Sequence, residues 1–458
     1  MMINPDSPQT VPFCDVEAHA WPPIKAGANA VLASLCHELD RSQWYSPEAL
    51  AGLQARQLQV LVQHHAQHTP HFRARLSEAG LGPEDITTPA TLTRLPLLTR
   101  RDIQAAGASL FALYVPKSHA PVNPSRTSGS TGEPVVVKRT GISQLFWSAL
   151  TMREHLWLKR DFSQKMAVIR AHIDAPSQVN SWGTPVSQFF RTGPRLRIPI
   201  LTPLSEQARM LAAYQPSVLL VYPNNLNGLA DVWEDDGSVP KSLRHIWTIS
   251  ESVSPALRER IRRLTDLGIE DNYSSQELGT IAIQCPESGL YHINAESVLI
   301  EVLNQAGKPC AEGETGRVVA TDLHNTATAI IRYEIGDHAE VGGACPCGRR
   351  LPTLRRIMGR SRNLVVHPDG RRHWPHVGQH LFRTVAPLRQ YQFIQHALES
   401  IEFKVVCDVP LTEIEREGLL QIARENIGPE FAFDLVEYRE RLPLQANGKF
   451  EDFISRVS

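Results

Sequence analysis

The stretch with the strongest chemical signature is a run of small hydroxyl residues and glycines at residues 126–134, which reads RTSGSTGEP and leads into three valines. Gly129 and Gly132 allow backbone conformations that other residues resist, and they leave the main chain accessible. Main-chain N–H groups and hydroxyls can therefore converge on an anion, which predicts a phosphate-binding loop. A Walker-type loop is excluded, because the Gly-Lys-Ser/Thr ending is missing and the glycines precede a strand instead of a helix. A Ser/Gly-rich surface turn is the alternative.

A second chemical signature comes from four cysteine and histidine residues. Six residues separate Cys285 from His292, and Cys345 and Cys347 stand in a Cys-Pro-Cys-Gly segment. Three thiolates and one imidazole form a ligand set for a tetrahedral structural Zn²⁺, with no open position left for catalysis. The two halves lie far apart in the sequence, so a buried thiol pair beside an unrelated histidine is the alternative.

The overall composition limits the classes of function. A length of 458 residues predicts at least two domains. The 47 basic and 48 acidic residues give a net charge of -1, which favours neither nucleic acid nor a membrane as a partner. No apolar run approaches the roughly 20 residues that cross a bilayer, and the N-terminus lacks a secretion signal. Seven cysteines suit free thiols better than a disulfide framework. We therefore expect a cytoplasmic protein.

The elements that must position these residues follow an α/β pattern. Continuous apolar runs at 166–169, 217–222 and 243–249, with a helix expected over 225–233, predict a parallel sheet covered on both faces. A further helix is expected to begin at Ser254-Pro255 and to carry arginines 258, 260, 262 and 263 on a solvated face. Later segments with strand character are 298–303, 316–321, 329–333, 390–395, 400–409 and 431–438. Thr412 and Glu415 form a capping box for a helix between the last two.

Several segments resemble the signatures of adenylate-forming enzymes, in the order in which that family carries them. The loop at 126–134 resembles the segment that grips the triphosphate of ATP, and LPLLTRRDI at 95–103 resembles the stretch that precedes it in enzymes related to phenylacetate-CoA ligase. Further matches are SES at 250–252, DNYSSQE at 271–277, IRYEIGD at 331–337 and GRSR at 359–362. From about Leu95 onward the chain is similar to the phenylacetate-CoA ligase-like branch, including its capsule-cluster relatives.

The resemblance implies roles for individual residues. Tyr273 would stack on adenine, Asp337 would take the ribose hydroxyls, and Glu277 would help to bind Mg²⁺. Lys449 would bridge the carboxylate and the α-phosphate, and Arg362 would stand at the hinge between domains. The residues implied to hold ATP are Thr127, Ser128, Gly129, Ser130, Thr131, Gly132, Ser250, Glu251, Ser252, Asn272, Tyr273, Ser274, Gln276, Asp337 and Arg360. Some members of the branch carry zinc where Cys285, His292, Cys345 and Cys347 stand here.

The implied fold class is α/β, with a large multi-sheet adenylation domain over residues 1–361 and a small mobile α+β domain over residues 362–458. The implied reaction is attack of a small, aromatic carboxylic acid on ATP, which gives an acyl-AMP and pyrophosphate, followed by acyl transfer to coenzyme A. Phe189, Phe190 and Tyr222 are candidates for the acid pocket, and a role in the core is the alternative.

The chain also departs from the family pattern. Ser274 replaces a glycine, Gln276 replaces a threonine or serine, and Arg362 replaces the hinge aspartate. The acceptor could therefore be a carrier-protein phosphopantetheine, an amine or a sugar hydroxyl, and a nucleotide-binding relative without catalysis is a further alternative. If the four Cys/His residues are considered alone, the chain could instead be a zinc-dependent regulator without affinity for ATP. The oligomeric state stays open, with a homodimer among the options.

Overall fold

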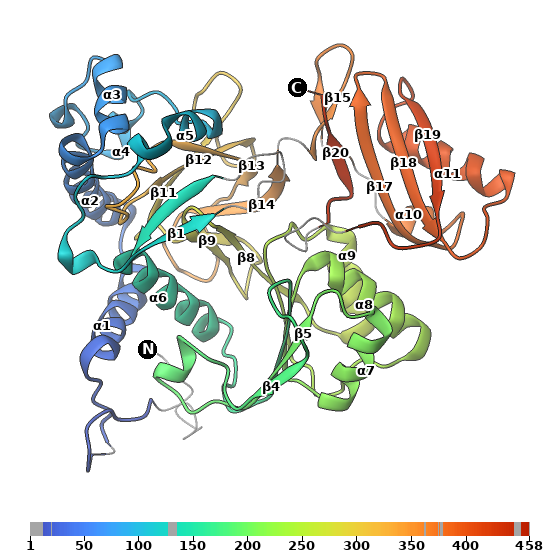
Figure 1. Cartoon of the computed structure of the whole chain (residues 1–458), viewed down its shortest axis with the longest axis horizontal. Helices are drawn as coiled ribbons and strands as arrows, with labels where there is room; N and C mark the ends of the chain where they lie inside the picture. The colour runs from blue at the N-terminus through green and yellow to red at the C-terminus, as the bar shows by residue number, and fades with distance from the viewer. Residues whose placement is uncertain are drawn as a thin grey trace.

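The computed structural model describes residues 12–19, 21–126, 135–360, 363–373, 375, 379–443 and 450–457. The predicted phosphate-loop residues Thr127, Ser128, Gly129, Ser130, Thr131 and Gly132 lie outside the described residues, as do Arg362 and Lys449. The described chain forms a large lobe up to residue 360 and a small lobe from residue 363 (Figure 1). Within these ranges, no helix combines the length and the apolar character needed to cross a membrane.

The N-terminal part of the large lobe is helical. Ser46 caps its second helix by accepting a hydrogen bond from the backbone N–H of Ala49 at 3.2 Å, with Pro47 in the first helical position. Thr99 and Asp102 form a capping box. The helices are α1 (Gly27–Ser42), α2 (Pro47–His68), α3 (Pro70–Glu78), α4 (Pro89–Leu92) and α5 (Arg100–Ala106), with 3₁₀ turns at Pro83–Asp85, Gly107–Leu110 and Lys117–His119.

A two-stranded antiparallel hairpin, β1 (Val122–Arg126) and β2 (Val136–Thr140), holds the two ends of the predicted phosphate loop. Arg126 pairs with Val136, so the chain enters and leaves the loop at neighbouring positions. The backbone N–H of Lys138 donates to Thr328 Oγ1 at 2.9 Å, which ties the hairpin to the rest of the lobe. Thr140 caps the following helix, α6 (Gly141–Trp157), by accepting from Ser143 N at 3.2 Å.

The core of the large lobe is a twelve-stranded sheet with the order β11-β12-β13-β14-β10-β9-β8-β7-β6-β3-β5-β4. Strands β5, β3, β6, β7 and β8 run parallel, as the buried apolar runs predict, and the strands from β9 onward pair antiparallel. The strands are β3 (Met166–Arg170), β4 (Ser177–Val179), β5 (Arg195–Pro199), β6 (Val218–Val221), β7 (His245–Thr248), β8 (Ile269–Ser275), β9 (Gly279–Gln284), β10 (Tyr291–Ile293), β11 (Val298–Leu303), β12 (Thr315–Asp322), β13 (Tyr333–Val341) and β14 (Thr353–Arg360). A 3₁₀ turn lies at Val186–Gln188.

The strand expected over 329–333 is wrong, because β13 begins only at Tyr333. Arg332 adopts a left-handed backbone conformation with φ of 53°, which ends any extended run before it. Its carbonyl accepts from Leu98 N at 2.7 Å, and its guanidinium pairs with Glu301 at 2.8 Å. The segment is therefore a buried connection.

Helices α7 (Leu204–Tyr214), α8 (Pro223–Asp236) and α9 (Pro255–Thr265) lie in a row beside the parallel strands (Figure 1). The prediction that the arginines of α9 form a solvated face is wrong for two of them. Arg258 donates to Tyr291 Oη and to Ile269 O, both at 2.9 Å. The Arg260 side chain is only 11% exposed, and it pairs with Asp231 of α8 at 2.6 Å. The arginine face of α9 is polar, as the sequence indicates, but neighbouring elements cover it and keep it from solvent at Arg258 and Arg260.

The small lobe has its own hydrophobic core, in which Phe382, Phe393 and Phe403 are fully buried. Its four-stranded sheet has the order β19-β18-β17-β20. Thr412 and Glu415 form the expected capping box of α11. The elements are β15 (Val365–Val366), β16 (Arg372–His373), α10 (Gln379–Phe382), β17 (Leu388–Ala397), β18 (Ser400–Cys407), α11 (Glu413–Asn426), β19 (Ala432–Tyr438) and β20 (Phe453–Ser455). The mixed α/β fold class is confirmed.

Candidate functional site

Three predicted nucleotide residues meet at one point of the large sheet. Tyr273 of β8 donates from its hydroxyl to Asp337 Oδ2 of β13 at 2.7 Å. Asp337 and Arg360 are directly paired across β13 and β14, and Arg360 Nε lies 3.8 Å from Asp337 Oδ1. Burial, the Asp337 carboxylate and Glu277 together raise the pKa of Tyr273 well above its usual value, so its phenol stays a donor. The sheet thus gathers an aromatic ring, a carboxylate and a cation from three separate segments.

The turn after β8 lies beside the hairpin that holds the predicted phosphate loop. Ser125 Oγ of β1 donates to the backbone oxygen and to Oε1 of Gln276, each at 3.4 Å. Glu277 is buried. The burial of Tyr333 and the negative charge of Glu277 both raise the pKa of the Tyr333 phenol. Burial lowers the pKa of Arg139 in β2, while Asp322 and Glu277 oppose that shift. Glu277 therefore interacts electrostatically both with Tyr273 and with Arg139 of the hairpin.

The remaining predicted nucleotide residues divide into two groups. Ser250, Ser252 and Ser274 are exposed to solvent. The side chain of Asn272 instead turns into the interior and donates to Glu154 Oε2 at 2.9 Å. Glu251 uses both carboxylate oxygens on backbone N–H groups: it accepts from Asn224 at 3.0 Å and from Phe450 at 3.1 Å. Phe450 belongs to the small lobe, so Glu251 joins the two lobes.

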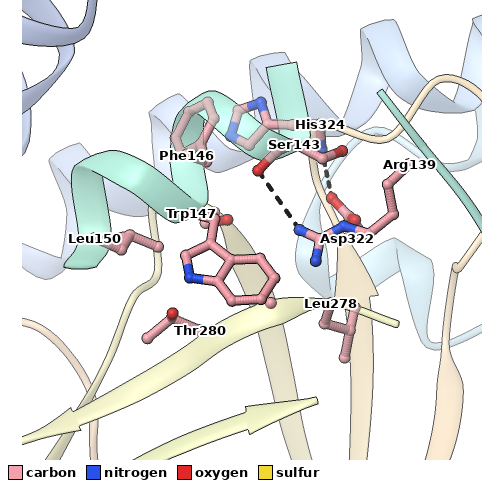
Figure 2. A pocket seen from close by; sticks show the side chains of 11 residues that line it. Arg139, Ser143, Phe146, Trp147, Leu150, Leu278, Thr280, Asp322 and His324 are labelled. Carbon is pink, nitrogen blue, oxygen red and sulfur yellow. Dashed lines mark hydrogen bonds between the residues drawn. The ribbon is translucent and has the colours of Figure 1, made fainter. Parts of the chain in front are cut away.

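A small cavity lies between α6, β9 and the end of β12. Figure 2 shows the Arg139 guanidinium pointing into it, with a hydrogen bond of 3.5 Å to Ser143 O. The cavity measures about 10 Å³, which is room for about one water. Its lining is Arg139, Ser143, Phe146, Trp147, Leu150, Leu278, Gly279, Thr280, Ser297, Asp322 and His324. It is too small for a carboxylic acid substrate.

The aromatic candidates for the acid pocket belong to the core. Phe189 and Phe190 are 2% and 1% exposed, and Phe190 packs against Phe162 at a ring-centroid distance of 4.8 Å. Tyr222 is also buried in the same cluster. The alternative reading of these residues, a role in the core, is therefore the one that the structure favours.

The four predicted zinc ligands come together. One ligand atom from each of Cys285, His292, Cys345 and Cys347 lies within 4.8 Å of all the others. Cys345 Sγ is 3.7 Å from Cys285 Sγ, and Cys347 Sγ is 3.3 Å from His292 Nε2. A tetrahedral Zn²⁺ with bonds of usual length would hold its ligand atoms about 3.5 to 3.8 Å apart. The donor types and their separations therefore fit zinc, and the alternative of an unrelated histidine fails.

The buried carboxyl group of Asp322, which lines the small cavity beside Arg139, leads to a prediction about pH. Burial raises the pKa of Asp322 to about 6, above the value near 4 of an unfolded chain. The folded state therefore holds this proton more tightly. The resulting stabilisation is fully present below about pH 4 and is lost as the pH rises through 6, by roughly 3 kcal/mol. In urea unfolding at pH 4 to 7, Asp322→Asn should lose less stability than the parent over this range. The exposed Asp408→Asn should match the parent, and equal slopes for all three proteins would contradict the prediction.

Comparison with known proteins was made by sequence and by fold. No protein-family model matches the chain. The chain is 24% identical over 400 residues to a phenylacetate-coenzyme A ligase of Thermus thermophilus, which covers 81% of this chain and 85% of that enzyme.

Two solved structures of 2-hydroxyisobutyryl-CoA ligase share the fold. The structure in the postadenylation state superposes with a TM-score of 0.71 at 18% identity, over 91% of each chain. The structure in the thioesterification state reaches 0.59 at the same identity, over 91% of this chain and 92% of that one. Over nearly equal lengths, the chain superposes better on the former structure. By sequence the chain is therefore similar to phenylacetate-coenzyme A ligases, and by fold it is similar to 2-hydroxyisobutyryl-CoA ligase.

Proposed function

We propose that this protein is an AMP-forming acid–thiol ligase that activates a small carboxylic acid as an acyl-adenylate and then transfers the acyl group to coenzyme A. The observation that carries the proposal is the meeting of Tyr273, Asp337 and Arg360 beside the hairpin that bears the phosphate-loop sequence. The similarity to phenylacetate-coenzyme A ligases supports both half-reactions.

The first half-reaction brings two anions together, so its transition state needs fixed positive charge and oriented donors. We assign Tyr273 to the adenine, Asp337 to the ribose hydroxyls and Arg360 to the nucleotide. The loop residues 127–132 would donate N–H and hydroxyl groups to the phosphates. Glu277 would help to hold Mg²⁺, which would supply positive charge for the leaving pyrophosphate. The predicted division into residues 1–361 and 362–458 would let Lys449 approach and withdraw.

We propose that the substrate is an aromatic acid and that coenzyme A is the acceptor. The names of the sequence relatives support both choices. We further propose that the four Cys/His residues bind a structural zinc. Cys345 and Cys347 stand in the connection between β13 and β14, the strands that carry Asp337 and Arg360. Zinc would therefore fix the connection between two nucleotide-binding strands and take no part in the reaction.

The test is acid-dependent pyrophosphate release from ATP and Mg²⁺ across aryl and short aliphatic acids, first without an acceptor and then with coenzyme A. Release with an aryl acid, stimulated by coenzyme A, is the expected result. Release that only a carrier protein, an amine or a sugar stimulates would overturn the assignment of the acceptor. ATP binding without release for any acid would overturn catalysis.

Asp337→Asn should raise the KM for ATP about tenfold and change kcat less, because the amide replaces one acceptor oxygen by an NH2 donor and removes the charge that strengthens hydrogen bonds from the ribose. Tyr273→Phe, which removes the hydroxyl contact with Asp337 and keeps the ring, is the matched control and should have a smaller effect. Steady-state pyrophosphate release at varied ATP measures both. An unchanged KM in Asp337→Asn would remove this residue from the nucleotide site.

A further inference from the structure

One face of α8 is turned towards the small lobe, which lies beside α8 and α9 in Figure 1. Contacts with the small lobe occur at Gly228, Asp231 and Glu234, spaced by three residues each. This spacing places them in one stripe along the helix. A Cβ added at Gly228 would lie 2.7 Å from Arg441 Nη2 of the small lobe, so the glycine lets the arginine approach the helix backbone. The stripe therefore forms a continuous docking surface on the large lobe.

The centre of this surface is an ionic cluster of two carboxylates and two arginines. Arg383, from the small lobe, donates to Asp231 Oδ1 at 2.5 Å and to Glu234 Oε2 at 3.1 Å. Arg260, from α9 of the large lobe, donates to the same two carboxylates and also to Asn227 Oδ1 at 2.6 Å. The cluster is partly buried, because Asp231 and Glu234 side chains are 20% and 29% exposed.

A second contact fixes the chain near the C-terminus. Phe450 N–H donates to Glu251 at 3.1 Å, and the same carboxylate holds the first turn of α8 through Asn224 N. On the other side of residues 444–449, Leu442 N donates to Gln390 Oε1 at 2.9 Å. Both flanks of this segment are therefore anchored, one of them directly on the large lobe.

We propose that Arg383 is a positioning residue that docks the small lobe on α8 in the arrangement needed for acyl-adenylate formation, and that this dock must open for acyl transfer. The proposal rests on the proposed two-step function. The proposal goes beyond that function because it names the contact that favours one arrangement of the two lobes.

The composition of the cluster makes the dock reversible. Breaking a buried ion pair is costly when it leaves a charge without compensation. Here Arg260 stays with Asp231 and Glu234 when Arg383 leaves, because Arg260 belongs to the large lobe. The departing Arg383 side chain, already 33% exposed, gains hydration. The small lobe can therefore leave without stranding either carboxylate, and salt should weaken the dock by screening the charges.

The test compares Arg383→Ala with Arg424→Ala in the full-length protein. Arg424 pairs with Glu417 at 2.8 Å within the small lobe, so its loss removes an ion pair without touching the interface. Arg383→Ala should slow acyl-adenylate formation about fivefold to tenfold, and it should leave thioester formation from a supplied acyl-adenylate unchanged or faster. Arg383→Lys, which keeps the charge, should recover part of the first rate. Arg424→Ala should leave both rates unchanged. Equal losses in both half-reactions, or no loss in either, would overturn the proposal.

A physical measurement separates this proposal from the proposed function. Small-angle X-ray scattering of the protein without substrates should give a larger radius of gyration for Arg383→Ala than for Arg424→Ala, and added salt should enlarge the parent but not Arg383→Ala. This result would support the dock even if no acid were activated. Identical scattering from the parent and Arg383→Ala would overturn it.

Discussion

Lys449→Ala is expected to lower the rate of acyl-adenylate formation about 10²- to 10³-fold while ATP binds nearly as well as before. A cation held between the attacking carboxylate and the α-phosphate stabilises charge that develops only in the transition state, so its loss acts on kcat. The resemblance assigns this role to Lys449, which immediately precedes the anchored Phe450. Single-turnover formation of acyl-AMP and equilibrium binding of ATP measure the two quantities separately.

The matched control for this change is Lys308→Ala, an exposed lysine in the turn between β11 and β12, which should leave both quantities unchanged. Thioester formation from a supplied acyl-adenylate should survive in Lys449→Ala, because the lysine acts only in the first step. If Lys449→Ala formed acyl-AMP at the parental rate, the lysine would have no part in the mechanism.

Cys345→Ser is expected to remove zinc and to destabilise the large lobe, lowering Tm by about 5 to 10 °C. Cys345 lies 3.7 Å from Cys285, and a hydroxyl is a poor substitute for a thiolate on zinc. Because the Cys345–Cys347 connection joins β13 to β14, the KM for ATP should rise as well. Metal content by mass spectrometry and thermal unfolding, with and without a chelator, measure the effect.

Cys310→Ser serves as the control, because Cys310 is a free cysteine outside the cluster. It should keep one zinc per chain and the parental Tm. A chelator should lower the Tm of the parent towards that of Cys345→Ser and should leave Cys345→Ser itself unchanged. Full zinc occupancy in Cys345→Ser would sink the proposed metal site.

The candidate nucleotide residues came from the resemblance of their segments to those of adenylate-forming enzymes. Tyr273 and Asp337 are 64 residues apart in the sequence, yet they lie on strands of the same sheet and their side chains are in contact. The four Cys/His residues were also predictable, since their donor types allow few alternatives. For the Cys/His set, residue chemistry alone restricted the possible partners.

Other features could not be predicted, because periodicity gives the polarity of a face and not what covers it. The Arg260 face of α9 is polar as expected, but Asp231 and Glu234 cover it together with Arg383 of the small lobe. Phe189 and Phe190 show the same limit for apolar residues: an aromatic ring suits a substrate pocket and a hydrophobic core equally, and only the structure shows that both rings are buried in the core. The left-handed Arg332 had no local signal, because its conformation is held by Leu98 and Glu301 from distant segments.

The most direct test of the proposed function is to identify the nucleotide and acyl products by mass spectrometry after incubation with ATP, Mg²⁺, coenzyme A and one aryl acid that supports turnover. We predict AMP, pyrophosphate and the acyl-CoA thioester in equal amounts, with acyl-AMP accumulating when coenzyme A is omitted. Formation of ADP and phosphate, or nucleotide turnover that does not depend on the acid, would contradict an AMP-forming acid–thiol ligase.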